Sequence, residues 1–288
     1  MSKKILIAGG CSYTDPNFTS LDTSLEENEK SGWPMWPEYL GNHLQLKTIN
    51  TGLSGASNET ILHRVMEQIL IYNEKVDTVA VMWSASDRRR LFAKYNLNPI
   101  SEAYTLSSES NNPLLWLNNI GLQDFSKNFF KSKYFYQVRS NFIKSAMEDS
   151  LRNYYMLADY CSKNKIKFIF VNALVPFHYD IFNILENSGF MQYPDNTKNI
   201  NPEWVVHTFY NNLFFNRFDS EYKKHFLGWP IFADIGGGYV SQWLDEKPSP
   251  YFNKYANYRI SKNDTHPNAM GQISVSKMII EKYEELYE

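Results

Sequence analysis

The chain has 288 residues, with 29 Lys and Arg against 31 Asp and Glu, which gives a formal net charge of −2. This even balance, without a long basic tract, argues against a protein that binds nucleic acid or another polyanion. No apolar run is long enough to span a bilayer, and no signal region precedes the first predicted strand. We therefore expect one large soluble cytoplasmic domain, residues 1–288, in which Cys11 and Cys161 are buried free thiols.

The stretch 3–15 predicts the first strand and a turn after it. Its apolar run Ile5-Leu6-Ile7-Ala8 is typical of a strand buried on both faces in a parallel sheet. Gly9 and Gly10 then allow a sharp turn, so Ser12 is expected at the carboxyl end of the strand, where open α/β sheets bind ligands. Ser is also a favoured helix N-cap, so this stretch alone leaves a capping role for Ser12 open.

The segments that follow alternate between helix and strand patterns. Residues 15–32 are polar and are expected to form a loop, before a short helix that ends near Leu44. Further strands are predicted at 46–50, 76–83, 167–173 and 229–233, and helices at about 58–72, at 137–164 and after Pro267. This alternation predicts a doubly wound, mostly parallel α/β sheet of five strands between two layers of helices.

Two regions without clear periodicity are expected to be insertions, at about 91–134 and 191–250. Both are rich in aromatic residues, of which the chain has 20 Tyr, 19 Phe and 7 Trp. These rings either fill the cores of the insertions or form a surface for sugar or acyl groups. We expect both insertions to cover the carboxyl edge of the sheet and to set substrate choice.

The loop before the last predicted helix carries an acid and a base. It reads Asn263-Asp264-Thr265-His266-Pro267. A serine hydroxyl becomes a good nucleophile only beside a base, and the base needs a partner that orients it. Asp264 and His266 would serve Ser12 in this way if the fold brings the two ends of the chain together.

The turn at Ser12 and the loop 264–271 together resemble the SGNH (GDSL-like) hydrolase superfamily. The first block of that family places the nucleophile in a Gly-x-Ser turn after the first strand, as in Gly10-Cys11-Ser12. Its last block carries an Asp and a His two or three residues apart, commonly followed by Pro-Asn, as in Asp264 and His266. The resemblance covers the ends of the chain well and the middle poorly. It implies the three-layer, flavodoxin-like form of the doubly wound sheet.

The resemblance also implies roles for the three polar residues, with no metal or organic cofactor. Ser12 would attack an ester carbonyl, and His266 would take its proton and return it to the leaving alcohol. The wider family usually has its acid three residues before the histidine, which is Asn263 here. Because an amide cannot stabilise the imidazolium by charge, we expect Asp264 to orient His266 and Asn263 to be a turn residue.

Several residues are candidate donors to the oxyanion. Gly55 matches the second-block glycine, whose N–H would point at the developing alkoxide together with that of Ser12. Alternatively, Gly55 serves only the turn. The third block of the family has an Asn after the third strand, but residues 83–87 lack one. The missing Asn would be replaced by Ser84 or Ser86, or by Asn58 from the second turn. Alternatively, both serines are only turn residues.

The resemblance favours a serine esterase or deacetylase that hydrolyses a small acyl ester, with O-acetyl groups on a carbohydrate as the narrower expectation. Two alternatives stay open. The same residues would serve an acyltransferase if a sugar hydroxyl replaced water. The missing third-block Asn also keeps open a non-catalytic glycan- or lipid-binding module on the same fold. In each case the partner is a small molecule or glycan, with no nucleic acid and no membrane span.

Overall fold

The structure is a computed structural model. It describes residues 4–86, 89–91, 104–106, 134–174, 210–232, 236–245, 258–261 and 263–288. Apolar runs along the chain form its strands and helices. The strands are β1 (Ile5–Gly10), β2 (Lys47–Asn50), β3 (Val76–Trp83), β4 (Arg89–Leu91), β5 (Tyr104–Leu106), β6 (Lys167–Asn172) and β7 (Phe226–Leu227). The helices are α1 (Glu27–Lys30), α2 (Trp36–His43), α3 (Asn58–Tyr72), α6 (Tyr134–Lys163), α9 (Leu213–Glu221), α10 (Val240–Asp245) and α11 (Ala269–Tyr287).

The central sheet has five strands in the order β2-β1-β3-β6-β7, and every neighbouring pair is parallel. This confirms the doubly wound α/β fold. The chain moves outward from β1 to β2 and then crosses to β3 on the other side of β1. Strand order reverses at that point, and ligands of open α/β sheets bind in the crevice at the carboxyl ends of the strands there. The turn after β1, which carries Ser12, lies at this edge.

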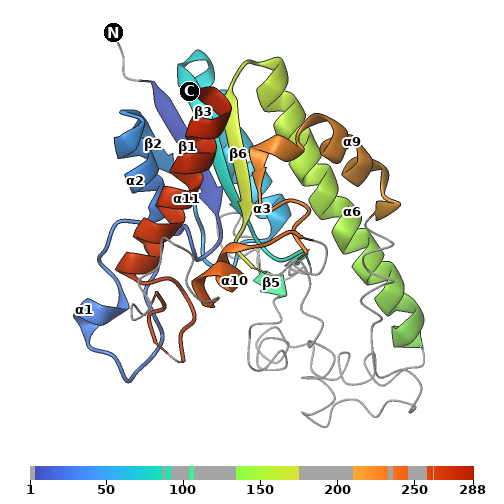
Figure 1. Cartoon of the computed structure of the whole chain (residues 1–288). Coiled ribbons are helices and arrows are strands. Elements are labelled where there is room, and N and C mark those ends of the chain that lie inside the picture. Colours follow the sequence, from blue (N-terminus) through green and yellow to red (C-terminus); the bar gives the residue numbers. More distant parts are fainter. Residues whose placement is uncertain are drawn as a thin grey trace.

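Helices cover both faces of the sheet, as Figure 1 shows. Alternate residues of β1 serve the two layers, because successive side chains of a strand point to opposite faces. Ile5 and Ile7 belong to one core, which includes buried residues of α3, α6 and α9. Leu6 and Ala8 belong to the other, which includes buried residues of α2, α10 and α11. The sheet is therefore buried on both faces, which explains why β1 and β3 read as continuous apolar runs.

The fifth strand is β7, so the prediction of a strand at 229–233 is wrong. Residues 229–232 instead turn back on themselves: the Ile231 N–H donates to the Gly228 carbonyl at 2.8 Å, and the Gly237 N–H donates to the Phe232 carbonyl at 2.9 Å. Pro230 has no N–H to give to a strand ladder. The sheet pairing falls three residues earlier, where Phe226 aligns with Phe170 of β6.

The two predicted insertions differ in how far the structure describes them. Most of 91–134 lies outside the described residues, apart from β5, which pairs antiparallel with β4. In 191–250 the described parts form regular elements, namely α9, β7 and α10. The coverage of the catalytic edge by these regions therefore stays a prediction. The segment 15–32, expected to be a loop, contains the single-turn helix α1.

Both cysteines are free and buried, as expected from the sequence. Burial raises the pKa of the Cys161 thiol well above its ordinary value. Among the described residues, no helix combines the length and the apolar character that crossing a bilayer requires.

The loop after β2 packs directly on the turn after β1. The N–H groups of Thr51 and Leu53 donate to the carbonyls of Ala8 and Gly10 at 2.8 and 3.1 Å. Gly52 lies between them, and a Cβ there would come within 2.5 Å of the backbone carbonyl carbon of Thr14. Only glycine therefore allows the two loops to approach this closely.

We expect Gly52→Ala to lower the free energy of unfolding by about 3 kcal/mol, because the added methyl group meets backbone that cannot move independently. Gly32→Ala is the matched control. Gly32 has a φ of +96° and open space where a Cβ would lie, so its substitution should cost only about 1 kcal/mol. Urea unfolding of the two variants measures the difference, and equal losses would contradict this account of the loop contact.

Candidate active site

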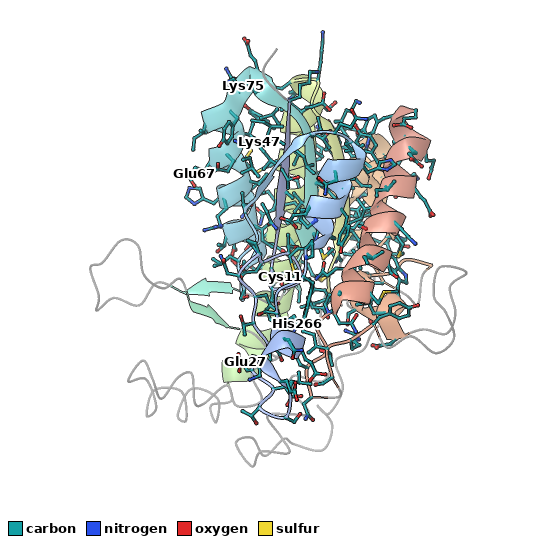
Figure 2. All side chains as sticks on the ribbon, turned by 90° about the vertical axis from the view of Figure 1, so that its left-hand side faces the viewer. Cys11, Glu27, Lys47, Glu67, Lys75 and His266 are labelled. Carbon is teal, nitrogen blue, oxygen red and sulfur yellow. The ribbon has the colours of Figure 1, made fainter. Side chains whose placement is uncertain are left out.

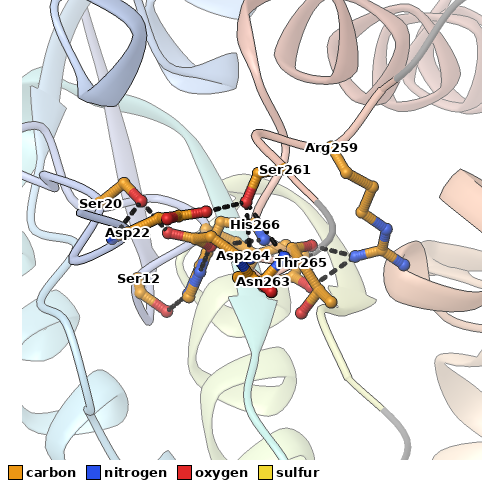
Figure 3. Close-up of polar contacts among 10 residues, drawn as sticks. Ser12, Ser20, Asp22, Arg259, Ser261, Asn263, Asp264, Thr265 and His266 are labelled. Atoms are coloured by element: carbon orange, nitrogen blue, oxygen red, sulfur yellow. Dashed lines mark hydrogen bonds and ion pairs between the residues drawn. The ribbon is translucent and has the colours of Figure 1, made fainter. Parts of the chain in front are cut away.

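A continuous chain of hydrogen bonds joins Ser12, His266 and Asp264. The Ser12 Oγ lies 2.7 Å from Nε2 of His266, although the two residues are 254 positions apart in sequence. The Nδ1 of His266 lies 2.6 Å from Oδ1 of Asp264. A neutral imidazole that donates from Nδ1 to the carboxylate accepts the serine proton at Nε2, as a general base must. Figure 3 shows this chain of contacts.

Ser12 lies in the turn that follows β1. The N–H groups of Thr14 and Asp15 both donate to the Cys11 carbonyl, at 2.8 and 3.1 Å, which closes the turn. The next helix begins at Glu27, so Ser12 caps no helix and the alternative of a capping role is wrong. The Ser12 side chain is nearly buried, with the residue 6% exposed.

His266 is supplied by the loop that leads into α11. Asn268 caps this helix by accepting a hydrogen bond from the Gly271 N–H at 3.0 Å. The Ile260 N–H donates to the His266 carbonyl at 2.9 Å, so the segment at Ile260 is hydrogen-bonded to the segment that carries His266. In Figure 2, Cys11 and His266 lie near one end of the sheet, while Lys47, which begins β2, lies toward the other.

Aromatic rings fix the plane of the imidazole. The ring of Phe18 lies against that of His266, with 4.3 Å between centroids, and the ring of Tyr13 lies 5.2 Å away on a tilted plane. Both residues come from the chain that follows β1. The His266 side chain is 23% exposed, so one part of it faces solvent while Ser12, Asp264 and the two rings surround the rest.

Asp264 is held as an anion by its contacts. Burial raises the pKa of its carboxyl, but hydrogen bonds from the His266 ring, the Ser20 hydroxyl and the His266 N–H outweigh burial and lower that pKa to about 2. The last of these bonds is 3.0 Å long. A permanently charged carboxylate beside Nδ1 favours the tautomer that leaves Nε2 free to accept a proton, and it would stabilise an imidazolium.

Asn263, the other residue considered for this position, points elsewhere. It is exposed, and its backbone N–H donates to the Ser261 Oγ at 3.1 Å. It is Asp264 that contacts the imidazole, which agrees with the choice made from charge in the sequence.

Among the backbone N–H groups near the Ser12 turn, two candidate oxyanion donors form no hydrogen bond to an acceptor in the described part of the chain. One belongs to Ser12 itself. The other belongs to Gly55, which has a φ of +75° and no atom within 4 Å of where its Cβ would lie. The four neighbouring amides of this turn all donate within the protein; they belong to Gly52, Leu53, Ser54 and Ala56.

A buried carboxylate connects the turn of Gly55 to the turn of Ser12. Oδ2 of Asp15 accepts hydrogen bonds from the N–H and the hydroxyl of Ser54, at 2.8 and 2.7 Å. Asp15 is only 7% exposed. Since Asp15 closes the turn after β1 and Ser54 directly precedes Gly55, the two turns are fixed to each other.

The three residues proposed to replace the third-block Asn lie in a different polar cluster. The Asn58 side chain accepts from the Ser84 N–H at 2.8 Å and donates to the Ser150 Oγ at 3.0 Å, so it joins α3 to β3 and α6. Ser86 contributes a hydrogen bond to Tyr154. The Ser84 hydroxyl is buried and has no partner among the described residues. Within the described chain, no hydrogen bond links any of the three to Ser12 or His266.

Sequence reasoning missed an arginine that holds the histidine loop. Arg259 donates from Nε and Nη2 to the two carboxylate oxygens of Asp245 on α10, at 2.8 and 2.5 Å. Its Nη1 donates to the Thr265 carbonyl and, at 3.1 Å, to the Tyr13 hydroxyl. One guanidinium thus ties α10, the turn after β1 and the peptide just before His266. No local pattern marks Arg259 for this role, because its side-chain partners Asp245 and Tyr13 are 14 and 246 positions away in sequence.

In the part of the chain that the structure describes, no group of three or more His, Cys, Asp or Glu side chains is close enough to hold a metal ion.

No protein-family model matches the chain, and no curated protein matches it either. Solved structures of similar architecture include a lipolytic protein of the G-D-S-L family from Desulfitobacterium hafniense, with 13% identity, a TM-score of 0.41 and coverage of 96% of this chain and 99% of that one. An acetylxylan esterase from Geobacillus stearothermophilus has 12% identity, a TM-score of 0.40 and coverage of 98% and 94%. A GDSL-like lipase from Parabacteroides merdae has 14% identity, a TM-score of 0.42 and coverage of 98% and 96%. These three structures have low identities and TM-scores, so we infer the function of this chain from its own contacts.

The stabilising contribution of Asp264 should disappear in acid. Its pKa is about 2 in the folded protein against an ordinary value of 3.8, so its contribution is complete above about pH 4 and is lost as the pH falls toward 2. We expect the difference in unfolding free energy between wild type and Asp264→Asn to shrink across that interval. Urea unfolding at a series of pH values measures it, with Glu281→Gln, an exposed carboxylate on α11, as the control. A difference that stays constant with pH would show that Asp264 is not held as described.

Proposed function

We propose that this protein is a serine hydrolase of the SGNH type that cleaves a small acyl ester. The observation that carries the proposal is the chain of hydrogen bonds from Ser12 through His266 to Asp264, at 2.7 and 2.6 Å. A nucleophile, a base and an anionic partner of the base occur together in this geometry when a serine hydroxyl is to be activated. The position at the carboxyl edge of a parallel sheet agrees with this role.

The chemistry follows from the contacts. Ser12 Oγ attacks the ester carbonyl carbon while its proton passes to Nε2 of His266, and Asp264 stabilises the imidazolium that forms. The imidazolium then protonates the alkoxy oxygen, so that the alcohol leaves and an acyl group remains on Ser12. Water attacks this acyl-serine, again losing a proton to His266. Release of the acid returns that proton to Ser12 and restores the starting state.

The N–H groups of Ser12 and Gly55 are the proposed donors to the oxyanion. Neither has an acceptor among the described residues, and the contact between Asp15 and Ser54 keeps their two turns together. Donors that are fixed before the reaction need no reorganisation when charge develops, which is the main source of such stabilisation. Asn58 is already committed to Ser84 and Ser150, so the two amides are better supported than the third-block candidates.

O-acetyl groups on a carbohydrate are the finer substrate class that we propose. The aromatic composition of the two insertions suggested it, and those insertions lie largely outside the described residues. A panel of short-chain nitrophenyl esters and acetylated sugars tests it. Activity confined to longer acyl chains would argue against an acetyl substrate, and turnover that depends on an added sugar acceptor would indicate acyl transfer instead of hydrolysis.

Ser12→Ala should abolish ester hydrolysis while leaving the unfolding temperature nearly unchanged, because among the described residues the Ser12 hydroxyl hydrogen-bonds His266 alone and lies outside the two apolar cores. A fluorophosphonate probe should label the wild type and fail to label the variant. Ser220→Ala is the control for the loss of a serine hydroxyl away from the site, because Ser220 is exposed on α9 and its hydroxyl donates to the Arg217 carbonyl. If Ser12→Ala retained wild-type turnover, another residue would be the nucleophile. Absence of both labelling and turnover in the wild type would favour a non-catalytic binding module.

Asp264→Asn should lower turnover by on the order of a hundredfold or more, about 3 kcal/mol of transition-state stabilisation, because an amide cannot neutralise the imidazolium. Asn263→Ala, one residue away and exposed, is the matched control and should lose far less. Steady-state kinetics on one nitrophenyl ester compares them. The opposite ranking would assign the orienting role to Asn263.

A further inference from the structure

Asp264 has a second partner besides His266, and it comes from the other end of the chain. The Ser20 hydroxyl donates a short hydrogen bond to Oδ2 of Asp264, across 244 positions of sequence. Ser20 lies between β1 and α1 and is only 3% exposed. Figure 3 shows Ser20 and its hydrogen bonds next to the group that contains Asp264 and His266.

The contacts of Ser20 fix the direction in which its hydroxyl donates. Its backbone N–H donates to the Lys30 carbonyl at 3.0 Å, which holds the residue in place. Its Oγ accepts a hydrogen bond from the Asp22 N–H at 3.2 Å. A hydroxyl has a single proton, and here that proton is given to Asp264.

The segment of Ser20 also reaches the backbone of Asp264, through Asp22 and the hydroxyl of Ser261. The Ser261 Oγ accepts hydrogen bonds from the N–H groups of Asn263 and Asp264, at 3.1 and 3.0 Å. The Ser261 hydroxyl in turn donates to the Asp22 carboxylate at 2.5 Å. Residues 20–22 therefore contact both the carboxylate of Asp264 and the turn that carries it.

We propose that Ser20 is a positioning residue for Asp264 in the hydrolase reaction, an inference that rests on the function proposed above. A carboxylate that is held at one oxygen can still rotate about its Cβ–Cγ bond. In this site Oδ1 accepts from the ring and the backbone N–H of His266, at 2.6 and 3.0 Å, and Oδ2 accepts from Ser20. With a hydrogen bond at each oxygen, rotation of the carboxylate is opposed and Oδ1 stays directed at Nδ1.

Kinetics of three variants tests this role. Ser20→Ala should lower kcat about tenfold with KM nearly unchanged, since it removes a charge-assisted hydrogen bond that acts on the base and not on the substrate. Ser20→Thr, which keeps the hydroxyl, should restore most of the rate. Ser24→Ala is the matched control, because Ser24 donates its hydroxyl to Asp22, at 2.6 Å, and not to Asp264. An unchanged kcat in Ser20→Ala would overturn the inference.

A double-mutant cycle tests whether Ser20 acts through Asp264. In an Asp264→Ala background the hydroxyl has lost its acceptor, so adding Ser20→Ala should change kcat by less than about twofold. A further tenfold loss in that background would mean that Ser20 affects the rate by another route, and the inference would be wrong.

The NMR signal of the His266 Nδ1 proton separates this inference from the proposed function, because it needs no turnover. A proton held between imidazole and carboxylate gives a downfield signal, which His266→Ala identifies by its absence. That signal should be lost or moved in Ser20→Ala and kept in Ser20→Thr and Ser24→Ala. An unchanged signal in Ser20→Ala would overturn the positioning role. A wild type with the signal but no esterase activity would overturn the proposed function instead, and the same three variants would still decide the role of Ser20.

Discussion

The hydrogen bond between Ser12 and His266 is the contact on which the candidate site depends, and the parallel sheet makes it geometrically available. All five strands point the same way, so the residue that follows β1 emerges at the edge where the chain order reverses. The loop before α11 reaches that edge because α11 packs against α2 and β6 on one face of the sheet. The packing of secondary structure thus brings together the turn after β1 and the loop before α11, which are far apart in the sequence.

Polar contacts then set the position of the histidine loop more finely than packing does. Arg259 ties the Thr265 carbonyl to α10, and the capping of α11 by Asn268 fixes the chain beyond His266. From the opposite side, the segment containing Ser20 and Asp22 contacts the loop through two hydroxyls. Ser20 and Arg259 are themselves buried, at 3% and 8% exposed, so the hydrogen bonds that they donate are strengthened by their low-dielectric surroundings.

Much of this architecture could be predicted from the sequence, for a definite reason. β1, β3 and β6, with helices α3, α6 and α11, carry local hydrophobic patterns that depend only on neighbouring residues. β7 pairs with β6 at only two positions, which is too short for any pattern, and the apolar run beyond it was taken for the strand. The pair Asp264 and His266 was found because its members are close in sequence. Ser20, Asp15 and Arg259 were missed because each acts on residues far along the chain.

The distance in sequence between Ser12 and its base has a consequence for the time at which activity arises during synthesis. Proteins are made from the N-terminus, and contacts between distant residues form only when both partners are present. A nascent chain that ends before residue 258 can already pair β1, β2, β3 and β6, but it has a serine without a base and an apolar sheet face that lacks α11. Under the proposed function, Ser12 would therefore lack its base until the segment that carries His266 has been synthesised and α11 has packed on that face of the sheet.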